Sequence, residues 1–179
     1  SVGRALRARV SDSWVTLLLI GAAQRWLHKQ FSGMSPRFRV SYDAFHAERS
    51  ARLDKDVDLA NVVAVLPGTK QKDRCLLVTA HYDSVAFQGN SSFHDPKYAP
   101  GVNDDGSGVA AVLESARVMS AYEFEKTVVF VAFAGEEVGL LGSEHYAKQA
   151  RQTEKQIEAV LNNDIIGNDT SGDGVKRPD

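Results

Sequence analysis

The sequence predicts an α/β protein, a three-layer sandwich in which helices cover both faces of a mixed, largely parallel sheet. Two observations lead to this fold class. Apolar runs of strand length alternate along the chain with segments of helical periodicity, an order that is typical of a largely parallel sheet with helices on its faces. Several of these runs are apolar throughout, as expected of strands that are covered on both faces.

The first expected element is a helix over about residues 4–31. Its apolar positions recur at helical spacing as far as Phe31, and Trp14 and Trp26 are expected in the core. A targeting segment is the alternative interpretation, because three arginines precede the largely apolar run 14–23 as they do in a signal peptide. That run is half as long as the roughly 20 apolar residues that span a bilayer, so no transmembrane span is predicted.

Five strands and two more helices are expected after this helix. Alternating apolar and polar residues predict a half-buried first strand, and amphipathic spacing predicts the helices, the first of them beginning with Ser107 as its N-cap. The expected elements are strands 38–44, 61–66 and 76–80, a polar loop 84–106, helix 109–121, strand 127–134, helix 143–150 and strand 159–163.

Side chains that can bind a metal ion stand at the ends of these strands. They are His81 and Asp83, Asp104 in the loop before the helix, Glu136 and Glu137, and Asp164. Ligands of open α/β sheets bind outside the carboxyl ends of the strands. One histidine and several carboxylates converging there suit a divalent cation, with zinc first.

The spacing of these residues suggests separate roles. Residues i and i+2 of an extended segment point the same way, so Asp83 can reach the imidazole of His81 and fix its tautomer. Glu136 and Glu137 are neighbours whose side chains diverge, so one can bind metal while the other faces a bound water as general base. Asp104 lies between two strand ends, where one carboxylate could bridge two ions.

Four segments resemble, in order and spacing, the zinc aminopeptidases of peptidase family M28, which belong to the di-zinc exopeptidase clan. They are HYDS from His81, PGVNDDGSG around Asp104, AGEEVGL around Glu136 and NND ending at Asp164. The resemblance runs from about Asn61 to Asp164. It implies a phosphorylase/hydrolase-like zinc exopeptidase fold and a single peptidase domain over residues 1–179.

The resemblance also implies a carboxylate-bridged pair of zinc ions. His81 and Asp164 would bind the first ion, Glu137 would bind the second, and Asp104 would bridge the two. The family completes the second site with a histidine that follows the last aspartate by many residues. None of the five histidines of this chain follows Asp164. We therefore expect a domain that is incomplete at its C-terminus, with one of its two zinc sites complete and its own activity open.

The catalytic residues implied by the resemblance are Glu136 and Asp83. Glu136 would be the general base that activates the bridging water, and Asp83 would be the partner of His81. The family also has a cis peptide after the bridging aspartate, here between Asp104 and Asp105. Asp105 itself is expected to orient the loop and not to bind metal.

The implied function is hydrolysis of N-terminal residues from peptides that have a free N-terminus. An M20-like metallocarboxypeptidase or deacylase is one alternative, which the GSG after Asp104 and the NND segment disfavour. A non-catalytic M28-like ectodomain is another, and the presence of the five site residues argues against it; they are His81, Asp104, Glu136, Glu137 and Asp164. Glutaminyl cyclases share the fold with a single zinc, but their site uses the late histidine.

Composition excludes other classes of protein. Lys and Arg number 21 against 23 Asp and Glu, a net charge of −2, so no basic excess suggests a nucleic-acid partner. The single cysteine, Cys75, forbids an internal disulfide and is expected to be buried. The family resemblance favours a secreted or periplasmic protein, with the cytoplasm as the alternative. The oligomeric state stays open.

Overall fold

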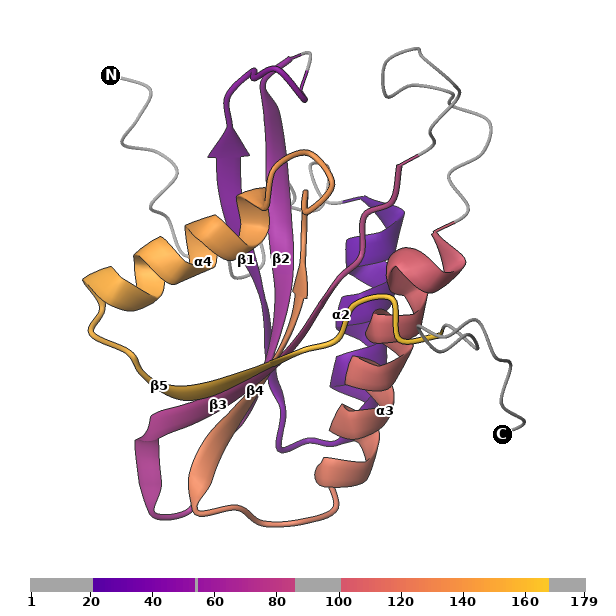
Figure 1. Cartoon of the computed structure of the whole chain (residues 1–179). Coiled ribbons are helices and arrows are strands. Elements are labelled where there is room, and N and C mark those ends of the chain that lie inside the picture. Colours follow the sequence, from indigo (N-terminus) through magenta and orange to yellow (C-terminus); the bar gives the residue numbers. More distant parts are fainter. Residues whose placement is uncertain (1–20, 54, 86–100, 168–179) are drawn as a thin grey trace, which may run out of the picture.

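Five strands form one mixed sheet in the order β1-β2-β4-β3-β5 in the computed structural model, which describes residues 21–53, 55–85 and 101–167 (Figure 1). The strands are β1 (Arg39–Ala47), β2 (Val57–Leu66), β3 (Gln71–His81), β4 (Lys126–Phe133) and β5 (Gln156–Asn162). All five expected strands are present, and β2 and β3 begin four or five residues earlier than their apolar runs suggest.

Parallel pairing is confined to one half of the sheet. β3 pairs in parallel with both β4 and β5, whereas β1 with β2 and β2 with β4 are antiparallel. The sheet is therefore mixed, as expected, with two of its four pairings parallel. The carboxyl ends of β3, β4 and β5 lie at one edge, and that arrangement positions the site.

Helices cover both faces of the sheet, so the three-layer prediction is confirmed. The helices are α2 (Ala22–Met34), α3 (Gly108–Met119) and α4 (Leu141–Gln152). Helices α2 and α3 lie side by side on one face, and α4 lies across the other (Figure 1). In the part of the chain that the structure describes, none of the helices has the length and apolar character of a membrane span.

Alternate residues of the central strands build two cores, because successive side chains of a strand point to opposite faces. One core holds Val62, Val78 and Phe130 beneath α2 and α3. The other holds Val129 and Tyr146 on the side of α4, where Cys75 is buried as expected. β5 is one of the two edge strands, and most of its residues are exposed.

The expected N-terminal helix is described only from residue 21 onwards. Its earlier part and Trp14 lie outside the described residues, as do residues 86–100 of the polar loop. The core position expected for Trp26 is wrong, since its side chain is 52% exposed. Leu27 and Phe31, four residues apart, share the buried face of α2, and the neighbour of Leu27 cannot lie on that face.

Candidate metal centre

The predicted site residues meet at the edge of the sheet where the parallel strands end. His81 is the last residue of β3, Glu136 follows β4 and Asp164 follows β5. Asp104 belongs to the turn Val102–Ser107, which leads into α3. Neighbouring parallel strands bring residues from distant parts of the chain together in this way.

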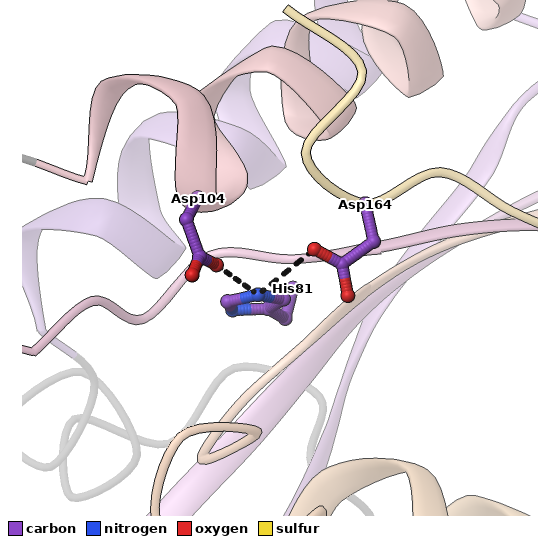
Figure 2. Close-up of side chains that lie close together, drawn as sticks. All are labelled: His81, Asp104 and Asp164. Carbon is purple, nitrogen blue, oxygen red and sulfur yellow. Dashed lines mark hydrogen bonds and ion pairs between the residues drawn. The ribbon is translucent and has the colours of Figure 1, made fainter. Parts of the chain in front are cut away.

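His81, Asp104 and Asp164 form a compact group of possible ligands. One possible metal-ligand atom from each residue lies within 4.8 Å of those of the other two (Figure 2). The Nε2 atom of His81 is 3.0 Å from Oδ1 of Asp104 and 3.9 Å from Oδ1 of Asp164. The imidazole is 4% exposed, whereas both carboxylates are open to solvent. The structure thus brings together the three residues expected at the first zinc site.

The tautomer of His81 is set by a backbone oxygen. Its Nδ1 lies 3.0 Å from the carbonyl oxygen of Asp83, and because a carbonyl can only accept, Nδ1 must donate. The carboxylate of Asp83 is farther from Nδ1, at 3.6 Å. Asp83 is therefore the partner of His81 as expected, but the closer contact comes from its main chain. Nε2 then faces the carboxylates, and it is the ring nitrogen that remains for a metal ion once its proton is displaced.

The carboxylate of Asp83 holds the segment that follows β4. It accepts hydrogen bonds from the backbone N–H groups of Glu136 at 3.1 Å and Glu137 at 3.2 Å. Burial raises the pKa of Asp83, but the hydrogen bonds that it accepts lower the pKa further, to below its usual value. Asp83 therefore stays ionised and fixes both glutamates.

Asp105 is a buried residue that orients the loop, as expected. It is 1% exposed, and its carboxylate accepts the N–H of His81 at 3.1 Å and the N–H of Gly108 at 3.0 Å. The peptide bond between Asp104 and Asp105 is cis, as the resemblance implied. Burial raises the pKa of the Asp105 carboxyl group.

The N-cap predicted for α3 is wrong. The hydroxyl of Ser107 makes no cap and donates to the carbonyl oxygen of Asn103 at 2.7 Å. The carboxylate of Asp105 takes its place, since it binds the N–H of Gly108 at the start of the helix. A side-chain oxygen that accepts from the first turn satisfies a donor that the helix leaves open.

Glu136 and Glu137 are partly buried beside the three-residue group. Burial raises the pKa of both carboxyl groups, and neighbouring carboxylates raise it further. Oε2 of Glu136 lies 3.9 Å from Nε2 of His81. Among the described residues, Glu137 is not part of the group whose donor atoms meet within 4.8 Å.

The electrostatics of the group favour a cation at Nε2 of His81. Burial lowers the pKa of His81, but Asp83, Glu136 and Asp105 raise it more, to about 9. An imidazole that gains a positive charge so readily sits in a strongly negative field. The same negative field attracts a metal ion. The imidazole nitrogen and carboxylate oxygens of the group are ligand types that zinc binds.

A cavity of about 330 Å³ adjoins the site. Its polar end contains His81, Glu136 and Asp164, and its apolar wall continues between β3, β5 and α4 through residues such as Leu77 and Tyr146. A ligand can therefore approach the carboxylates from one side of the sheet edge.

Sequence reasoning missed two residues that connect the site with β2, Asn61 on that strand and Tyr82 after β3. Asn61 is fully buried, and the hydroxyl of Tyr82, next to His81, donates to the carbonyl oxygen of Ala60 at 2.8 Å. The signal for Asn61 was a single polar residue at the start of an otherwise apolar strand, because a buried amide needs hydrogen-bond partners.

Comparison with known proteins leads to the same family that the sequence motifs resemble. The model of peptidase family M28 matches residues 61–177. A probable zinc metalloprotease from Pyricularia oryzae is 40% identical over 163 residues, which cover 89% of this chain and 32% of the relative. Aminopeptidase YwaD from Bacillus subtilis is 44% identical over 91 residues, covering 50% of this chain and 18% of the relative.

Solved structures show the same similarity. BSAP, a zinc aminopeptidase from Bacillus subtilis, aligns with a TM-score of 0.51 and 34% identity over 63% of this chain and 25% of that one. A glutaminyl cyclase from an Acidobacteriales bacterium has a TM-score of 0.66 over 83% of this chain and 51% of that one, and at 24% identity it shares the fold. The chain spans about a third of the length of the first curated relatives, 32% and 35% for two of them.

Proposed function

The chain belongs to peptidase family M28, and from this premise we propose that it provides the zinc-binding centre of an aminopeptidase. The substrates would be peptides with a free N-terminus, from which the N-terminal residue is hydrolysed. The observation that supports this proposal most strongly is the meeting of His81, Asp104 and Asp164 within 4.8 Å.

The donor set suits zinc. His81 offers an imidazole nitrogen with a fixed tautomer, and Asp104 and Asp164 offer carboxylate oxygens. These are the ligand types of catalytic zinc sites with three protein ligands. A bound zinc would polarise the scissile carbonyl and lower the pKa of a water molecule. We propose two ions in the active protein, with Asp104 between them and Glu137 on the second.

Glu136 is the proposed general base. Burial and neighbouring carboxylates raise its pKa, which favours acceptance of a proton at a pH near neutrality. Its carboxylate would take a proton from the attacking water and deliver it to the leaving amine. Asp83 supports this step, because it holds the backbone N–H of Glu136 in place.

Electrostatics also favour an N-terminal substrate. A free α-amine is largely positive at neutral pH. Asp104, Glu137 and Asp164 place negative charge around the position where the scissile bond would lie. An internal peptide bond lacks that positive charge and gains nothing from these groups.

For the location of the protein we propose the secreted or periplasmic compartment.

The replacement of Glu136 by glutamine tests the proposal in the full chain. The wild type should contain zinc and hydrolyse an aminoacyl chromogenic substrate. Glu136→Gln should keep its zinc and lose hydrolysis by about 100-fold or more, the usual contribution of a positioned general base. Glu123→Gln, an exposed change outside the site, is the matched control. Absence of zinc in the wild type, or full activity of Glu136→Gln, would contradict the proposal.

A further inference from the structure

We infer that Asn61 is a positioning residue, which sets the loop that carries Glu136 and Glu137 against the sheet. We call residues 135–141 the glutamate loop. The inference rests on the proposed function of the two glutamates. It concerns a residue on β2, a strand that provides none of the proposed ligands.

Asn61 uses its whole side chain to connect three segments. It is 0% exposed. Its Nδ2 donates to the carbonyl oxygen of Gly142 at 2.9 Å and to Oδ2 of Asp43 at 3.0 Å. Its Oδ1 accepts the backbone N–H of Ala134 at 3.0 Å. Both donor hydrogens and the acceptor are therefore occupied.

Two of these partners are the residues that flank the glutamate loop. Ala134 precedes the loop and Gly142 follows it, and the N–H of Gly142 donates to the carbonyl oxygen of Ala134 at 2.8 Å. Inside this pair, the N–H of Leu141 donates to the carbonyl oxygen of Gly135 at 2.9 Å. The loop is thus closed at its base, and Asn61 binds both sides of the closure.

The fit at Gly142 requires a residue without a side chain. A Cβ atom there would lie 2.2 Å from Oδ1 of Asn61 and 2.5 Å from the carbonyl oxygen of Ala134. Such distances are far shorter than van der Waals contact, so any larger residue would push the loop away from Asn61. Gly142 therefore lets the chain enter α4 in direct contact with the amide.

A second set of contacts keeps Asn61 itself in place. Asp43 lies opposite Asn61 in the register of β1 and β2. Its carboxylate accepts from Nε2 of Gln149 at 3.2 Å and lies 3.1 Å from Nε2 of His145, both on α4. His145 is half-buried, and its ring is held against the carboxylate of Asp43. β1, β2 and α4 are joined through this network.

The glutamate loop is therefore held at two places. Asp83 holds the N–H groups of Glu136 and Glu137, and Asn61 holds the base. The segment that carries His81 and Asp83 is tied to the same strand, since Tyr82 donates to Ala60, the neighbour of Asn61. The relative placement of the histidine and the glutamates thus depends on adjacent residues of β2.

Hydrogen exchange of the full-length chain without metal tests this inference, with Asn61→Ser as the variant. Serine removes the amide without adding charge. The N–H groups of Glu136 and Glu137 should exchange about tenfold faster or more, because the free energy of local opening falls by about the contribution of one hydrogen bond. The N–H groups of His81 and Gly108, which Asp105 holds, should exchange as in the wild type.

Thr127→Val is the matched control, because Thr127 is also a buried polar residue, and its bonds lie at the far end of β4. It should not accelerate exchange in the glutamate loop. Unchanged loop exchange in Asn61→Ser, or an equal rise at His81 and Gly108, would overturn the inference. If Asn61→Ser does not fold, Gly142→Ala perturbs the same contact from the other side and is read in the same way.

The two proposals fail separately in this design. Exchange is measured without zinc, so a wild type that binds no zinc would refute the proposed function and leave the exchange result intact. The Asn61→Ser variant should bind zinc at His81, Asp104 and Asp164 with the affinity of the wild type. Its kcat should fall while its KM stays the same, because a displaced Glu136 affects the reaction and not the binding of substrate.

Discussion

The carboxylate of Asp83 accepts a hydrogen bond from the backbone N–H of Glu136 at 3.1 Å. Asp83 follows β3 and Glu136 follows β4, so this bond joins the ends of two neighbouring parallel strands. The carbonyl oxygen of Asp83 also accepts from Nδ1 of His81. One residue therefore orients the proposed metal ligand through its main chain and the proposed general base through its side chain.

Asp83→Asn should destabilise the fold. An amide has one acceptor oxygen, so one of the N–H groups of Glu136 and Glu137 would face an NH₂ group. A partly buried donor left without an acceptor costs about 1–3 kcal/mol of the free energy of unfolding, which urea denaturation measures. Asp73→Asn, an exposed change on β3, the strand that precedes Asp83, is the control. Equal losses in the two variants would show that the bonds of Asp83 contribute nothing.

Gly108→Ala should weaken zinc binding as well as stability. A Cβ atom at this position would lie 2.4 Å from the carbonyl oxygen of Asn163 and 2.4 Å from Oδ1 of Asp105. α3 would then move away from the segment that carries Asp164, at a cost of about 1–3 kcal/mol typical of overpacking. Zinc titration and urea denaturation measure the two effects.

Gly33→Ala is the control for that change. A Cβ atom on Gly33 would meet nothing within 4 Å, and alanine is favoured over glycine in a helix by about 0.5–1 kcal/mol. This variant should keep its zinc affinity and match or exceed the wild type in stability. A Gly108→Ala protein that behaves like Gly33→Ala would contradict the close approach of α3 and Asn163.

Zinc affinity should increase with pH. Burial lowers the pKa of His81, but the surrounding carboxylates raise it more, to about 9, so the metal-free protein carries an imidazolium at neutral pH. Zinc binds the neutral imidazole and must displace that proton. Affinity should therefore rise about tenfold per pH unit between roughly pH 6 and pH 8 and flatten near the pKa of His81. Competition with a chelating dye measures it, and an affinity independent of pH in this range would contradict the assigned ligand.

The convergence of the site residues could be predicted from the sequence because it follows from topology. His81, Glu136 and Asp164 each follow an apolar run of strand length. Parallel neighbours place such positions at one edge of the sheet whatever the details of packing. The cis peptide between Asp104 and Asp105 could be anticipated only through the family resemblance, since no spacing rule indicates it.

Other features depend on backbone paths that residue types do not determine. Ser107 and Asp105 are both acceptable caps, and the geometry of the turn selected the aspartate. The Nδ1 atom of His81 lies closer to the carbonyl oxygen of Asp83 than to its carboxylate, because that carboxylate is turned toward Glu136. Asn61 was recognisable only as a polar residue in an apolar strand, and its partners come from segments up to 81 residues away.

The central claim is that His81, Asp104 and Asp164 bind zinc, and a competition titration of the full-length chain tests it most directly. The wild type should bind zinc, and His81→Ala and Asp164→Ala should bind it at least about 100-fold more weakly, since each removes one of three protein ligands. His46→Ala removes an exposed histidine on β1 and should bind as the wild type does. Equal zinc affinity in the wild type, His81→Ala and Asp164→Ala would contradict the account.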